Sequence, residues 1–165
     1  RVLKYSYSNF DKKSPPVESN DLLIDEDIKK FFSVTHDYVK KYITALEGVK
    51  IKEGLKIANE IVEEGNKFFQ DSKPWDLKKT NPERCGLVIS AVINFLRVIG
   101  VVYEPYIPSF SAKLYEILNI KYDTGAEVFL KTLNENNSDY ISTLIPKNHP
   151  INEPLPLFKE SMIDF

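Results

Sequence analysis

Residues 81–103, NPERCGLVISAVINFLRVIGVVY, predict one helix that is apolar on nearly every face from residue 85 to residue 103. Its opening Asn-Pro-Glu is typical of a helix start, because Asn caps, Pro fits the first position and Glu complements the helix dipole. A helix this apolar lies in a membrane or in the middle of a domain. We reject the membrane because Asn94 and Arg97 lie near its centre, where charge is costly in lipid. The segment therefore predicts a buried central helix.

Three polar residues, Ser90, Asn94 and Arg97, interrupt this helix at a spacing that places them on one face. The ordinary expectation is that such a stripe faces solvent or bonds the backbone of a neighbouring segment. A ligand site on the stripe is the alternative.

Helical periodicity continues upstream of the central helix. The acidic residues 25–27 are typical of a first turn, and apolar residues then recur every three or four positions up to Gly48, a natural stop. A second amphipathic helix starts near Ile51 and is expected to end one or two residues before Pro74. Gly65 lies inside it, and we expect this glycine to mark the close approach of another backbone.

The remaining segments also favour helices and loops. They are a helix end at 1–11, a polar loop at 14–23, a helix capped by Ser109 that ends near Leu118, a helix start with a Thr124/Glu127 capping box, and a polar loop at 134–139. Four prolines follow from Pro146, so the tail is expected to be extended, with Leu157 and Phe158 as apolar anchors. We predict an all-α bundle of about five helices over residues 1–145. A tail over residues 146–165 should pack on the bundle or on another domain.

Composition limits the possible functions. The 165 residues, 42% of them hydrophobic, suffice for one domain with a core. A net charge of −2 excludes a generally basic nucleic-acid coat, so any RNA contact must be local. The single cysteine excludes an internal disulfide, and the two histidines lack partners at metal-ligand spacing. We find no Gly-rich phosphate loop and no nucleophile motif, so we expect binding rather than catalysis.

The chain opens within an amphipathic pattern, without Met and without a signal-peptide leader. We therefore expect it to be a fragment of a longer protein.

The single tryptophan, Trp75, follows Pro74 directly and is expected just past a helix end. Lysines surround it in the sequence, so an exposed indole here would be a platform for stacking an unpaired base. The alternative is that Trp75 folds back onto the core, as most lone tryptophans do.

Charge is uneven along the chain. Residues 1–13 carry a net +3 and residues 67–84 a net +2, whereas residues 14–27 carry a net −5. If the first helix packs beside the end of the helix before Trp75, Arg1 comes close to the indole. The indole could then stack a base, and the paired N–H donors of the guanidinium group could bind a base edge or a phosphate.

These stretches resemble the anticodon-binding helical domain of class I aminoacyl-tRNA synthetases, most closely that of the methionyl-tRNA synthetase family. The resemblance covers nearly the whole chain. It rests on Gly65-Asn66 with Pro74-Trp75, Val49 to Leu55, Arg84-Cys85-Gly86 with Asn94, Pro105-Tyr106-Ile107-Pro108, and the tail motifs His149-Pro150-Ile151 and Pro156-Leu157-Phe158. The Pro-Trp element and the tail favour the methionine family, whereas the polar insert at 134–139 departs from it.

The resemblance implies a role for individual residues. Trp75, after Pro74, would stack the first base of the CAU anticodon. Arg1 would contact the same base as the Arg of an Asn-x-x-x-Arg motif, whose Asn would lie four residues upstream of this sequence. Asn66 would support the tryptophan segment, or alternatively would only pack between helices. Weaker phosphate contacts are expected from Lys67, Lys73, Lys78 and Lys79.

The resemblance also implies a longer, cytoplasmic protein that ligates methionine to tRNA-Met with ATP and Mg2+. The His-x-Gly-His and Lys-Met-Ser-Lys-Ser motifs of that activity are absent from this sequence, so the cofactors belong to a catalytic domain upstream. The present chain is expected to bind the anticodon loop of tRNA-Met without a cofactor, metal or membrane. The alternatives are the same domain of another class I synthetase, or a helical protein-interaction module whose Trp75 enters a partner's groove.

Overall fold

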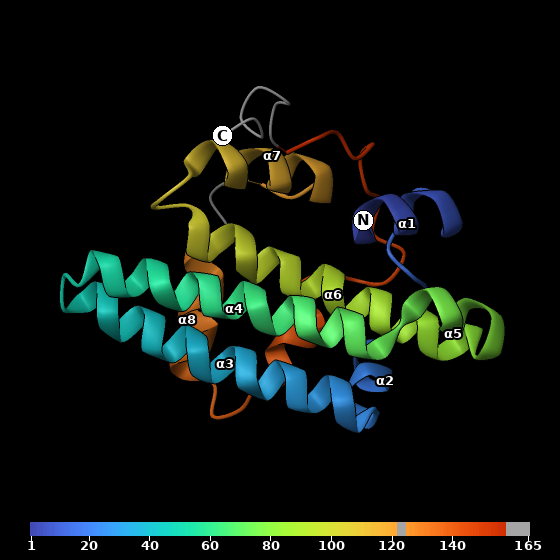
Figure 1. Cartoon of the computed structure of the whole chain (residues 1–165), viewed down its shortest axis with the longest axis horizontal. Coiled ribbons are helices and arrows are strands. Elements are labelled where there is room, and N and C mark those ends of the chain that lie inside the picture. The colour runs from blue at the N-terminus through green and yellow to red at the C-terminus, as the bar shows by residue number, and fades with distance from the viewer. Residues whose placement is uncertain (122–124, 158–165) are drawn as a thin grey trace.

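The computed structural model describes residues 1–121 and 125–157, and it confirms the predicted all-α bundle (Figure 1). β pairing within these residues is limited to an isolated bridge between Lys13 and Pro150. In chain order the elements are α1 (Val2–Asn9), α2 (Ser19–Ile24), α3 (Glu26–Glu47), α4 (Ile51–Ser72), α5 (Pro74–Thr80), α6 (Pro82–Tyr103), α7 (Pro108–Leu118), α8 (Gly125–Asn134) and the 3-10 helix η2 (Asp139–Thr143).

Helix α6 is the central helix that its sequence predicts. The Asn81 side chain accepts a hydrogen bond from the Arg84 backbone N–H at 3.2 Å, so the expected N-cap is confirmed. All the other helical elements named above contact α6. Among the described residues it is the one helix long and apolar enough to cross a membrane, but 89% of its most apolar window is buried in the bundle. This burial is that of a core helix.

The polar stripe of α6 bonds the backbone of a neighbouring segment, as expected. The Asn94 Oδ1 atom accepts from the Ile145 N–H at 2.7 Å, and Arg97 Nη1 donates to the Leu144 carbonyl at 2.6 Å. Arg97 Nη2 also donates to Glu127 Oε2 of α8 at 3.1 Å. These buried polar groups therefore fix η2 and α8 against the central helix.

Helices α3 and α4 form a long antiparallel hairpin beside α6 (Figure 1). Gly48 ends α3, as predicted. Gly65 of α4 does mark a close approach, but the expectation of another backbone was wrong. A Cβ atom at Gly65 would overlap the ring of Phe95, a buried residue of α6. The missing side chain thus leaves room for an aromatic ring between α4 and α6.

We predict that Gly65→Ala lowers the free energy of unfolding by about 1–3 kcal/mol, because the added methyl overlaps a ring that packing holds in place. Gly86→Ala is the matched control, since a Cβ there meets only ordinary van der Waals contacts. The control should be neutral or stabilising by up to about 1 kcal/mol, the helix propensity of Ala. Urea unfolding followed by far-UV circular dichroism measures both, and equal effects would contradict the packing argument.

A buried hydrogen-bond chain joins α3 to α8 and η2. Thr132 Oγ1 donates to the Val128 carbonyl at 2.8 Å, so its oxygen accepts from the Tyr140 hydroxyl at 2.7 Å. The Tyr140 oxygen is then left to accept from His36 Nδ1 at 3.1 Å. His36 Nε2 is buried without a hydrogen-bond partner among the described residues. A neutral imidazole that carries its proton on Nδ1 satisfies this chain best, because a proton on Nε2 would be buried without an acceptor.

We predict that stability falls when the pH drops below about 6.5, the ordinary pKa of histidine. Burial lowers the pKa of His36 in the folded protein, so the unfolded chain takes up the proton first. Stability is complete above the unfolded-state pKa, is lost as the pH falls through it, and levels off below the folded-state pKa. The loss is about 1.4 kcal/mol per unit of pKa difference.

Denaturant unfolding between neutral pH and pH values just above the carboxylate range measures this loss. His36→Asn keeps an N–H donor near the Nδ1 position and removes the titration, so its stability should be flat over the same range. A slope that persists in this variant would exclude His36 as its source.

After a turn at Lys147 and Asn148, where Asn148 has a φ of 53°, the C-terminal tail is extended from His149 on and packs across the bundle, in line with its prolines. Ser14 Oγ donates to the Pro146 carbonyl at 2.7 Å, and the Ser14 N–H donates to the His149 carbonyl at 2.8 Å. Further along, the Asn152 N–H donates to the Ile117 carbonyl of α7 at 2.9 Å. The division of the chain at 145/146 stays a prediction.

Several local predictions differ from the structure. The loop expected at 14–23 contains the short helix α2, and its Leu22 is buried in the core. Ser109 is not the cap of α7, because Pro108 is already the first helical residue and Ile107 occupies the N-cap. Thr124 of the proposed capping box and the anchor Phe158 lie outside the described residues.

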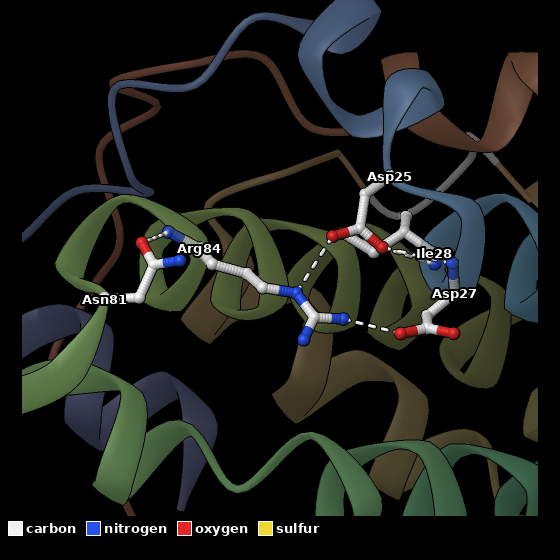
Figure 2. Close-up of polar contacts among 5 residues, drawn as sticks. All are labelled: Asp25, Asp27, Ile28, Asn81 and Arg84. Atoms are coloured by element: carbon white, nitrogen blue, oxygen red, sulfur yellow. Dashed lines mark hydrogen bonds and ion pairs between the residues drawn. The ribbon is translucent and has the colours of Figure 1, made fainter.

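An ion-pair cluster fastens the start of α6 to the start of α3 (Figure 2). Asp25 Oδ1 caps α3 by accepting from two backbone N–H groups, those of Asp27 and Ile28, at 3.1 Å each. Asp25 Oδ2 accepts from Arg84 Nε at 3.0 Å, and Arg84 Nη2 donates to Asp27 at 2.6 Å. These carboxylates raise the pKa of the Arg84 guanidinium. One carboxylate, that of Asp25, thus serves as both helix cap and ion-pair partner.

The two functions of Asp25 separate by mutation. Asp25→Asn keeps the capping oxygen and loses the charge, so we expect it to cost about 1 kcal/mol. Asp25→Ala loses the cap as well and should cost about 2 kcal/mol. Denaturant titration of both variants at low and moderate salt measures the difference. Equal losses would mean that the cap contributes nothing.

Candidate nucleic-acid interface

A sharp corner between α4 and α5 carries the candidate site. Helix α4 ends at Ser72, within the predicted limits, and Lys73 takes a left-handed conformation with φ 46° and ψ 59°. Pro74 does more than stop α4, because it also occupies the first position of α5. Trp75 therefore lies just past the end of α4, as predicted, and is the second residue of a short helix that the sequence analysis did not predict.

The indole of Trp75 is held by one aromatic contact and is partly open to solvent. Its side chain packs against Phe69 of α4, with ring centroids 5.9 Å apart and planes at 73°. The residue is 46% exposed. The indole is therefore not sealed in the core, although it packs on Phe69, which itself packs against the core.

Arg1 and Asn66 line one groove beside this corner. The groove has a volume of about 660 Å³ and lies between α1, α4, α6 and α7. Its walls are mostly apolar, and Arg1, Asn66 and Gln70 supply polar groups. Trp75 does not line the groove itself, but its contact residue Phe69 does. The structure therefore brings Arg1, Asn66 and Trp75 to neighbouring surfaces around Phe69.

The four lysines do not share one environment. Lys73 and Lys79 are exposed, and both lie close to Trp75 in the sequence. Lys67 lines a different hollow between α3 and α4, together with the acidic Asp27 and Asp71. Lys78 Nζ donates a hydrogen bond to Asn9 of α1. A phosphate role is thus most compatible with Lys73 and Lys79.

A contact network around Tyr5 joins α1 to α5 and α6. The Tyr5 hydroxyl lies 3.5 Å from Cys85 Sγ, and this sulfur also lies 3.4 Å from the Pro74 carbonyl oxygen, to which it donates. Burial and the contact with Cys85 raise the pKa of Tyr5 to about 12, so the hydroxyl stays protonated. Lys78 Nζ lies 5.6 Å from the centre of the Tyr5 ring and donates to Asn9 Oδ1 at 2.8 Å.

Sequence reasoning missed four residues of this region. Phe69 and Gln70 follow Asn66 by three and four positions on one helix, so helical spacing alone could have placed them beside it. Tyr5 and Cys85 are separated by 80 positions, and no local pattern signals their contact.

Comparisons with known proteins show the family of the chain. A family described as the anticodon binding domain of methionyl tRNA ligase matches residues 24–158. The chain belongs to this family. It is 36% identical over 140 residues to a probable cytoplasmic methionine–tRNA ligase of Dictyostelium discoideum, covering 82% of the chain and 17% of that protein. It is 34% identical over 128 residues to the cytoplasmic methionine–tRNA ligase of Arabidopsis thaliana, covering 74% and 15%.

A solved structure shares the fold. The apo form of Mycobacterium tuberculosis methionyl-tRNA synthetase aligns with a TM-score of 0.74 at 15% identity, over 96% of this chain and 30% of that one. The chain thus spans less than a fifth of the curated relatives named above.

Proposed function

We propose that this chain reads the CAU anticodon of tRNA-Met within a cytoplasmic methionine–tRNA ligase. The half-exposed indole of Trp75 carries this proposal, because its exposed surface can stack an unpaired base while the contact with Phe69 holds the ring in place. Family membership and the relatives named as methionine–tRNA ligases support the choice of tRNA.

The residues of the neighbouring groove would contact the same nucleotide. Arg1 has paired donors for a base edge or a phosphate, and Asn66 offers an amide on the adjacent helix. Lys73 and Lys79 would attract the backbone phosphates of the loop. Aminoacylation, with its ATP and Mg2+, would belong to the catalytic part of the longer protein, and no residue of this chain is assigned to it.

We predict that Trp75→Ala in the full-length enzyme raises KM for tRNA or lowers kcat by roughly five- to a hundredfold, since a base stack contributes about 1–3 kcal/mol. Methionine-dependent ATP–pyrophosphate exchange should stay nearly intact. Trp75→Phe keeps a smaller stacking face and should lose less. Leu130→Ala, at an exposed apolar residue of α8, is the control for loss of surface area.

Competition between anticodon stem-loops tests the specificity. A CAU loop should compete with tRNA-Met, and a loop with another first base should compete less well against the wild type. This preference should shrink in the Trp75→Ala variant. An equal fall of exchange and aminoacylation in that variant would instead assign Trp75 to packing.

A further inference from the structure

The helix that carries Trp75 is too short to hold itself in place. Helix α5 has seven residues, and a helix of that length is not stable alone. Pro74 is its buried residue, and Leu77 is half-buried. The position of the indole therefore depends on what α5 contacts in neighbouring helices.

Two of these contacts lead to α1 and flank the indole. At the start of α5, the Pro74 carbonyl is linked to the Tyr5 hydroxyl through Cys85 Sγ, at 3.4 and 3.5 Å. One turn later, Lys78 donates to Asn9 at 2.8 Å and lies over the Tyr5 ring. Positions 74 and 78 are thus matched with positions 5 and 9, and each pair is one helical turn apart.

The partner of Lys78 is oriented for a cation. Asn9 Nδ2 donates to the Tyr5 carbonyl at 2.8 Å, so its Oδ1 is the atom left to face the ammonium group. Asn9 is also the last residue of α1, where the helix carries partial negative charge. Lys78 is exposed, and on its protein side its Nζ meets an amide oxygen, an aromatic face and a helix C-terminus.

The same turns of α1 lead to Arg1. Arg1, Tyr5 and Asn9 follow one another at intervals of four residues, and the Tyr5 N–H donates to the Arg1 carbonyl at 2.9 Å. Arg1 lines the groove beside Phe69, the residue that contacts the indole. The contacts of Lys78 with Asn9 and Tyr5 therefore set the position of Trp75 relative to Arg1.

We propose that Lys78 is a positioning residue of the anticodon site, which holds the helix of Trp75 against the helix of Arg1, and that it is not a phosphate contact. This rests on the function proposed above for Trp75. The two roles differ in a measurable way, because a phosphate contact contributes to the salt dependence of RNA binding and a contact inside the protein does not.

Affinity of the full-length enzyme for tRNA-Met, measured over a range of salt concentrations, tests the proposal. The variants are Lys78→Met, Asn9→Leu and their combination, each made with Trp75 and with Trp75→Ala. Each single change should weaken binding roughly fivefold, the effect of one hydrogen bond. The double variant Lys78→Met/Asn9→Leu should bind tRNA-Met no more weakly than whichever single variant binds less tightly. The slope of log K against log salt should not change.

With Trp75→Ala in place, Lys78→Met should have no further effect, because no indole remains to be positioned. Lys79→Met is the matched reference, since the exposed Lys79 side chain makes no hydrogen bond or ion pair within residues 1–121 and 125–157. As a phosphate contact it should reduce the salt slope by about 0.7.

A similar reduction of the slope by Lys78→Met, or additive effects of Lys78→Met and Asn9→Leu, would overturn the positioning role. So would normal binding by both single variants while Trp75→Ala binds weakly. If Trp75→Ala itself binds tRNA normally, the proposed function fails instead, and the two failures are distinguishable.

Discussion

The burial of α6 is the constraint on which the rest of this structure depends. A 22-residue helix with apolar side chains on every face must be covered on every side, and the other helical elements are arranged around it. Two of its three polar exceptions, Asn94 and Arg97, are buried and need hydrogen-bond partners, which they find in the backbone directly after η2; Arg97 also pairs with Glu127 of α8. The arrangement of the bundle thus follows from the apolar surface of α6 and from the buried side chains of Asn94 and Arg97, which need hydrogen-bond partners.

The predictable part of the fold is the part that local chemistry specifies. Helices α3 and α6 begin at their capping residues Asp25 and Asn81, and Gly48 ends α3. Helix α2 was missed because six residues with two adjacent leucines show no helical period. Helix α5 was missed because Pro74 was taken only as a stop for α4, whereas proline also fits the first position of a helix.

The residues proposed for the candidate site come from the sequence, whereas their arrangement in space has no local signal. Proline and lysines around a lone tryptophan suggested a base-stacking surface, and the exposure of Trp75 agrees with it. Whether an indole faces solvent is decided by tertiary partners such as Phe69, and those contacts have no local signature. The same holds for Lys78. The sequence around a lysine in a basic stretch does not show whether its ammonium group contacts solvent, RNA or an asparagine of another helix.

The tail has a consequence for the order of folding. The hydrogen bond between the His149 N–H and Ser14 Oγ closes a loop of 135 positions, and the Ile151 N–H bonds the Lys12 carbonyl beside it. Such distant pairings form only after the chain between them has become compact, since closing a long flexible loop is entropically costly. We therefore expect the tail to dock late in folding. It then joins the loop after α1 to a bundle that α3, α4 and α6 have already formed.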